Sequence, residues 1–154
     1  MRVLSLNLHC QQEPDAAGKL LELAQLIHEQ AVDLVLLQEV GQSIDAPVVD
    51  TRWQVPIRAD NPALAICRRL AELGESYDWG FDWSHIGFDR YEEGLAILSR
   101  GRLANVRSEY VSRSSDSDFW KSRRALLADV EVADGSLSVV CAHLGWWHDD
   151  EEPM

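Results

Sequence analysis

The first forty residues constrain the fold most, because they switch between two hydrophobic periodicities. Apolar and polar residues alternate over residues 3–8, which is the period of a half-buried strand. Leucine and alanine then recur at helical spacing over residues 17–31, and a short apolar run follows at 34–37. A strand, a helix and a second strand in this order predict a β-α-β unit with two parallel strands.

The rest of the chain predicts one more helix and a set of strands. Pro62 is well placed to begin a helix that runs to about Leu73, and Gly74 would end it. Residues 41–61 contain prolines and little periodicity, which predicts a long connection. Further strands are expected within residues 77–86, 94–99, 103–111, 125–132 and 137–144. The expected fold class is therefore α+β, with two helices and about six strands.

The net charge of this chain limits the classes of partner that it can bind. Its 154 residues carry 14 basic and 26 acidic side chains, which gives a net charge of −12. A surface of this charge repels a polyanion, because affinity for nucleic acid comes largely from Lys and Arg. Nucleic acid is therefore disfavoured as a partner, whereas a small phosphate ester or a bound cation fits. No apolar run approaches the roughly 20 residues of a membrane helix, so no membrane partner is expected.

Three cysteines, Cys10, Cys67 and Cys141, lie far apart and beside apolar residues. An odd number of cysteines without zinc-like spacing predicts reduced, mostly buried thiols. The N-terminal apolar stretch is short and interrupted by Asn7 and His9, which makes it a poor signal peptide. We therefore expect a cytoplasmic protein.

Polar side chains interrupt or end the apolar strands at four places. They are Asn7, Glu39, the pair Tyr91 and Glu93, and His143. Each alone has an ordinary structural explanation, such as a turn cap, a surface strand end or a satisfied core histidine. Together they predict a ligand site, because ligand sites in layered folds gather at strand ends.

The segments that contain these residues resemble a known family. They are residues 3–7, 36–40, 91–100 and 139–144, in this order. As an ordered set they resemble the first half of the endonuclease/exonuclease/phosphatase family, which includes DNase I-like nucleases, sphingomyelinases and inositol-phosphate phosphatases. Three other segments resemble a bacterial subgroup that includes maltose 6'-phosphate phosphatase, namely residues 42–47, 83–87 and 143–147.

The resemblance implies a metal-dependent hydrolase of a small phosphate ester, with a sugar phosphate monoester favoured. Glu39 would bind the divalent cation, Mg²⁺ or Mn²⁺, because a carboxylate is the hard oxygen ligand that such a cation prefers. Asn7 would lie beside it and orient the metal, a water or a phosphate oxygen.

The resemblance also implies residues that handle the phosphate. Tyr91 would donate a hydrogen bond to it. Glu93 would orient His143, which would contact the phosphate or assist proton transfer. Arg124 would add positive charge to the pocket, and Arg123 is almost as good a candidate.

Two later motifs of the family, a Gly-Asp-Phe-Asn-like segment and a Ser-Asp-His, are absent from this sequence. Residues 1–154 are therefore expected to form one incomplete domain, the N-terminal half of a four-layer α-β-β-α sandwich with one sheet mainly from each half. The inner face of its sheet would lack a partner, which predicts a homodimer through that face or a fragment of a longer polypeptide. Such a half should hydrolyse its substrate slowly or not at all.

Two other functions stay open on the sequence. A Mg²⁺-dependent nuclease or phosphodiesterase of the same fold is disfavoured by the charge, and a non-catalytic fragment or interaction module would keep the half-fold without catalysis. The aromatic residues are equally open, since a sugar-stacking platform and structural packing both explain Trp79, Trp83, Trp146 and Trp147. His85 is interpreted as a surface histidine.

Overall fold

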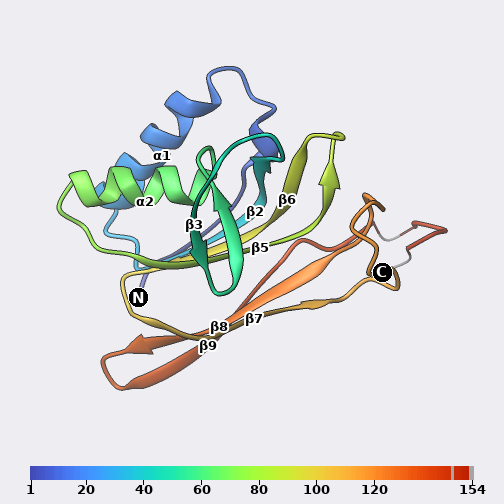
Figure 1. Ribbon diagram of the computed structural model, residues 1–154. Coiled ribbons are helices and arrows are strands. Elements are labelled where there is room, and N and C mark those ends of the chain that lie inside the picture. The colour runs from blue at the N-terminus through green and yellow to red at the C-terminus, as the bar shows by residue number, and fades with distance from the viewer. Residues whose placement is uncertain (147, 153–154) are drawn as a thin grey trace.

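The computed structural model describes residues 1–146 and 148–152 and shows three layers (Figure 1). One layer holds two helices, α1 (Ala16–Glu29) and α2 (Pro62–Glu72), together with a short 3-10 turn, η1 (His9–Gln11). The middle layer is a sheet with the order β1 (Val3–Asn7), β2 (Leu34–Ser43), β6 (Tyr91–Ser99), β5 (Asp78–Gly87). The third layer is a sheet with the order β7 (Leu103–Tyr110), β8 (Arg124–Val132), β9 (Gly135–Ala142).

The predicted β-α-β unit is confirmed. Strands β1 and β2 are parallel, and their register runs from Val3 opposite Leu34 to Asn7 opposite Gln38. Strand β6 is antiparallel to both of its neighbours, β2 and β5. The carboxyl ends of β1, β2 and β5 therefore meet the amino end of β6 at one edge of the sheet.

Strand β6 separates two hydrophobic cores, because successive side chains of a strand point to opposite faces. Ala96 and Leu98 are fully buried and pack in the core that includes the helices. Leu95 and Ile97 face the other way and pack in the core that includes strands β7, β8 and β9. Period-two alternation in one central strand thus holds the three layers together.

The described residues form nine strands, so the expected number of about six was too low. Two of the additional strands, β3 (Val48–Arg52) and β4 (Val55–Arg58), form a hairpin inside residues 41–61, which the sequence analysis assigned to a connection. Four of the five residues of β3 are exposed. No buried face therefore imposes an alternation that the sequence would reveal.

The expectation of one sheet mainly from each half, with a bare inner face, was also wrong. This chain supplies strands to both sheets, and the three-stranded sheet covers the inner face of the first one. Exposed apolar side chains lie instead on edge strands, namely Val3 and Leu6 of β1 and Val140 of β9, with exposed fractions of 52%, 39% and 54%. Homodimerisation stays a prediction, and a dimer would form most readily through these unpaired strand edges.

The cysteines and the helices agree with the sequence analysis. All three thiols are free, with Cys10 and Cys141 buried and Cys67 half-buried. Burial raises the pKa of Cys67 to about 12 and that of Cys141 to about 11, so these thiols stay protonated near neutral pH. In the described part of the chain, neither helix has the length and apolar character needed to cross a membrane.

A largely buried ion pair fastens the β3–β4 hairpin to the four-stranded sheet. The Arg58 guanidinium donates to both oxygens of Glu92, with Nη2 at 2.9 Å and Nε at 3.0 Å. Gln42 is fully buried and donates to the same carboxylate at 2.6 Å. Asn61, which caps α2, donates in turn to Gln42 at 2.8 Å.

We expect Arg58→Met to lower the free energy of unfolding by about 2 kcal/mol, because it leaves the Glu92 carboxylate buried and without its main partner. Arg69→Met is the matched control, since Arg69 and Glu72 form an exposed ion pair on one helix. Its loss should cost less than about 0.5 kcal/mol. Urea denaturation of both variants measures the difference, and equal losses would contradict this account.

Candidate functional site

Glu39 occupies a β-bulge in the middle of β2, one residue beyond the last pair that β2 forms with β1. Gln38 and Val40 pair with the consecutive β6 residues Leu95 and Gly94, so Glu39 has no residue opposite it. Its backbone φ is +50°, in the left-handed region that residues other than glycine seldom adopt. Bulges redirect side chains and are frequent beside active sites. This one makes the Glu39 side chain available at the edge of the sheet where the strand ends meet.

Two of the predicted side chains meet Glu39. Asn7, at the end of β1, donates from Nδ2 to Glu39 Oε1 at 2.6 Å. His143, directly after β9, has its Nε2 3.7 Å from the same oxygen. The Asn7 amide is fixed from its other side, because its Oδ1 accepts from the backbone N–H of His9 at 2.8 Å. The structure therefore brings Asn7, at the end of β1, and His143, directly after β9, to Glu39 in the middle of β2.

Glu39 and His143 line a cleft of about 450 Å³, whereas Asn7 contacts Glu39 but is not among the described residues that line the cleft. Its ionisable lining comprises the histidines 9, 85 and 143, the acids Glu39 and Glu93, and Arg123. Burial lowers the pKa of His143, with Arg123 acting in the same direction and Glu39 opposing both. The His143 ring is therefore neutral near pH 7.

Aromatic side chains form the exposed part of the same cleft. Phe88, Trp120 and Trp146 line it, with exposed fractions of 63%, 48% and 66%. The rings of Trp120 and Trp146 meet edge to face, with their centroids 5.7 Å apart. The cleft thus combines a charged interior with an aromatic mouth.

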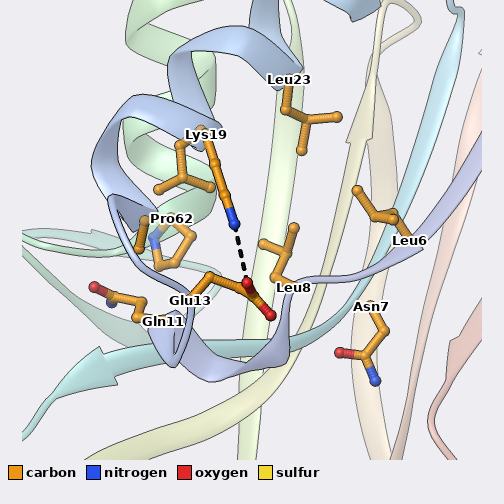
Figure 2. A pocket seen from close by; sticks show the side chains of 10 residues that line it. Leu6, Asn7, Leu8, Gln11, Glu13, Lys19, Leu23 and Pro62 are labelled. Carbon is orange, nitrogen blue, oxygen red and sulfur yellow. Dashed lines mark hydrogen bonds and ion pairs between the residues drawn. The ribbon is translucent and has the colours of Figure 1, made fainter.

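A second pocket lies beside α1 and is shown in Figure 2. It measures about 160 Å³ and is lined mainly by leucines of β1, α1 and the segment between them. Lys19 also lines it, but its ammonium group lies 2.9 Å from the Glu13 carboxylate. This apolar pocket with a neutralised cation is a poor match for a phosphate. The larger cleft is therefore the candidate site.

Glu93 lines the cleft, but the structure places it against His85 rather than His143. Its Oε1 is 3.5 Å from His85 Nε2. Burial raises the pKa of Glu93. His85 is only 4% exposed, so its interpretation as a surface histidine was wrong. A second bulge, at Ser84, brings His85 opposite Glu93, and the sequence carries no signal of that register shift.

The two candidate arginines have different surroundings. Arg123 lines the cleft, and its Nη1 donates to the carbonyl oxygen of Trp120 at 2.8 Å. The Arg124 Nη1 donates to Asp82 at 3.0 Å, and its guanidinium carbon lies 4.0 Å from the centre of the Tyr110 ring. The structure therefore assigns the positive charge of the cleft to Arg123, the second of the two sequence candidates.

Tyr91 is set apart from the other predicted site residues. It is 7% exposed and lies against Gly41, and it is not among the described residues that line the cleft. The tryptophans considered for sugar stacking also fall into two groups, those in the core and those at the cleft. Trp79 is buried in the core beside the helices and Trp83 packs against that core, whereas Trp146 lines the cleft. Trp147 lies outside the described residues.

The sequence analysis missed four lining residues: His9, His85, Phe88 and Trp120. His9, beside Asn7, could have been suspected from its place at the end of the first strand. Phe88 and Trp120 lie in connections between strands, where no periodicity marks a functional side chain.

Comparison with known proteins supports the fold. Residues 4–152 match the sequence profile of the Endonuclease/Exonuclease/phosphatase family. No curated protein matches the chain. An endonuclease/exonuclease/phosphatase family protein from Leptotrichia buccalis C-1013-b has a similar structure, with 24% identity and a TM-score of 0.92. That alignment covers 100% of this chain and 57% of the other.

Two solved structures with described activities or ligands share the fold at lower similarity. The mannosyl-6-phosphatase Bt3783 of Bacteroides thetaiotaomicron VPI-5482 is 16% identical, with a TM-score of 0.55 over 90% of this chain and 48% of its own. D. rerio TDP2, complexed with a single-strand DNA product, is 18% identical, with a TM-score of 0.57 over 96% and 47%. This chain thus spans about half the length of the structures it resembles. Because the profile covers nearly all of the sequence, the chain belongs to the Endonuclease/Exonuclease/phosphatase family.

Proposed function

We propose that this chain carries the metal-binding and phosphate-binding part of a hydrolase that cleaves a small phosphate ester, above all a sugar phosphate monoester. One observation carries the proposal, namely that Glu39, which meets both Asn7 and His143, lines one cleft together with His143 and Arg123. Phosphoryl transfer needs fixed positive charge and hydrogen-bond donors where negative charge develops. The cleft offers both.

The surroundings of Glu39 fit a hard divalent cation such as Mg²⁺ or Mn²⁺. Within residues 1–146 and 148–152, no three His, Cys, Asp or Glu side chains form a metal-binding group, so a cage of protein ligands is absent there. Mg²⁺ needs no such cage, because it often binds through one or two carboxylates together with waters and phosphate oxygens. Glu39 would hold the cation, and Asn7 would hold Glu39 through its 2.6 Å bond. When bound, the cation would stabilise charge on the phosphate oxygens.

The other residues of the cleft act on the phosphate and on protons. Arg123 attracts the phosphate group and can bond its oxygens in two places, as a guanidinium does. The neutral ring of His143 can accept a proton from a water molecule or donate a hydrogen bond to a phosphate oxygen. We leave Tyr91 and Arg124 out of this scheme, because Tyr91 is not among the described residues that line the cleft and Arg124 is paired with Asp82.

The net charge of the chain and the aromatic side chains at the mouth of the cleft both bear on the class of substrate. A net charge of −12 disfavours a long nucleic acid. Exposed aromatic faces suit the C–H face of a sugar ring, and the mannosyl-6-phosphatase shares the fold. The DNA-bound TDP2 structure supports the second candidate, a Mg²⁺-dependent nuclease or phosphodiesterase. We further propose that the chain is the N-terminal half of a longer domain and that it acts slowly by itself in the cytoplasm.

Phosphate release from mannose 6-phosphate, compared with nicking of plasmid DNA, tests the proposal. We expect slow, Mg²⁺-dependent phosphate release that EDTA abolishes, and no nicking. Nicking without phosphate release would favour the phosphodiesterase. No reaction on either substrate, with no heat in a calorimetric Mg²⁺ titration, would favour a non-catalytic fragment or interaction module.

The neighbouring arginines provide a matched pair of variants. Arg123→Met should raise the KM for the phosphate ester about 30-fold, because a charged hydrogen bond of about 2 kcal/mol is lost. Arg124→Met should leave KM within about twofold and lower the free energy of unfolding, because Asp82 loses its partner. Steady-state kinetics and urea denaturation of both variants check the assignment. If Arg124→Met raises KM and Arg123→Met does not, Arg124 and not Arg123 binds the phosphate.

A further inference from the structure

His85 is a buried histidine of the cleft for which the proposed reaction has no role. It lies directly after the bulge at Ser84 and pairs with Glu93 of β6. It is 4% exposed although its ring is polar. A buried polar group is costly unless its atoms find partners, so the contacts of the ring show what holds it in place.

The two ring nitrogens of His85 face different parts of the chain. Nδ1 is 3.1 Å from the carbonyl oxygen of Ser122, and a carbonyl only accepts, so Nδ1 carries the hydrogen. Nε2 is 3.5 Å from Oε1 of Glu93. The Ser84 hydroxyl donates to the Glu93 carbonyl oxygen at 3.3 Å, and its oxygen, 3.0 Å from Nδ1, is a second acceptor there.

Burial shifts the pKa values of His85 and Glu93 in opposite directions. Burial lowers the pKa of His85 to about 4, and the positive charge of Arg123 adds to this effect. The ring is then neutral, and its Nε2 presents a lone pair to Glu93. Burial raises the pKa of Glu93, and a hydrogen bond with the Cys10 side chain opposes this effect. A bare nitrogen and an ionised carboxylate would repel, whereas a proton between them satisfies both.

The carbonyl that His85 binds belongs to the connection between β7 and β8, residues 111–123. This connection lies on the end of β5 at two points, because the backbone N–H of Ile86 also donates to the carbonyl of Ser117 at 2.8 Å. It brings Arg123 and Trp120 to the cleft. One ring therefore links a carboxyl group of the sheet to the segment that supplies the positive charge.

We propose that His85 is a positioning residue that holds the Glu93 carboxyl group and the Arg123 segment in one fixed arrangement at the cleft. Its effect on turnover rests on the proposed function, whereas the arrangement is a property of the folded chain. Glu93 then has His85 as its partner, and His143 is left to Glu39.

Two isosteric substitutions separate the two contacts of the ring. His85→Asn keeps an amide nitrogen near the position of Nδ1 and removes the group that faces Glu93. His85→Gln places an amide near the position of Nε2 and leaves the Ser122 carbonyl without its donor. His28→Asn is the control, because His28 lies on α1 and bonds to Glu75 away from the cleft.

NMR spectra of the chain give the first measurement. We expect His85→Asn to shift the side-chain carboxyl carbon resonance of Glu93 and to leave the backbone amide resonances of Ser122 and Arg123 in place. His85→Gln should shift those two amides most, and His28→Asn should shift none of these signals. If both His85 variants shift the same signals, or neither shifts any of them, the positioning role is wrong.

Kinetics give the second measurement. His85→Asn should lower kcat about tenfold with KM nearly unchanged, because the Glu93 carboxyl group, which lines the cleft beside the reacting groups, loses its orientation. His85→Gln should raise KM about tenfold, because the Arg123 segment loses its anchor. The NMR shifts require no turnover, so an inactive chain with the expected shifts would overturn the proposed function alone. An active chain without them would overturn the role of His85 alone.

Discussion

Glu39→Gln should reduce phosphate release about 10³-fold and should abolish Mg²⁺ binding. The substitution keeps the size of the side chain and its hydrogen bond with Asn7 but removes the negative charge that would hold the cation. Loss of one electrostatic stabiliser in an active site costs about 10²–10³ in kcat. The loss of kcat should reach the upper end of this range, because the described residues contain no other metal-binding cluster that could replace Glu39.

Calorimetric Mg²⁺ titration and steady-state phosphate release measure the two effects separately. Glu72→Gln is the control, because Glu72 has the same side chain, 66% exposed, on α2. The free energy of unfolding of Glu39→Gln should stay within about 0.5 kcal/mol of the parent, because the substitution keeps the size of the side chain and its hydrogen bond with Asn7. If Glu39→Gln binds Mg²⁺ and turns over substrate as the parent does, Glu39 is not part of the site.

Gly94→Ala should destabilise the fold by about 4 kcal/mol, the largest stability loss that we expect from one methyl group. Gly94 pairs with Val40 on one side and with Trp83 on the other. The two bulges, at Glu39 and Ser84, therefore flank the same residue of the central strand. A Cβ at Gly94 would lie well inside van der Waals contact with the Asp82 carbonyl oxygen and the Trp83 Cα. Both are backbone atoms, which cannot move without shifting β5.

Urea denaturation of Gly94→Ala tests this account, with Gly145→Ala as the control. A Cβ at Gly145 would meet the Glu152 carbonyl oxygen at 3.5 Å, an ordinary contact, so its cost should be below about 1 kcal/mol. If Gly94→Ala is as stable as Gly145→Ala, strand β5 does not approach β6 in the way described.

Much of the fold could be predicted from local pattern. The alternation in the first strand and the helical spacing that follows predict β1, α1 and β2, because each element must bury one face. Pro62 and Gly74 bracket α2 for the same local reasons. The meeting of Asn7 and Glu39 also follows, since the carboxyl ends of parallel neighbours lie at one edge of a sheet.

The remaining errors concern features that no local hydrophobic pattern marks. The β3–β4 hairpin has a largely exposed strand, so its sequence carries no alternation. Arg123 and Arg124 are adjacent, and only tertiary contacts decide which of them reaches Asp82 of β5 and which lines the cleft. No property of the two residues themselves distinguishes them.

The sequence by itself determined the class of the fold, the β-α-β unit at its start and the family to which the chain belongs, because these depend on local periodicity and on short motifs. The tertiary structure alone decided which polar groups face each other. A strand alternates with period two, so one extra residue in a bulge sends every later side chain to the opposite face. The bulges at Glu39 and Ser84 are such insertions. Because of them, Glu39 lies beside His143 and Glu93 lies beside His85.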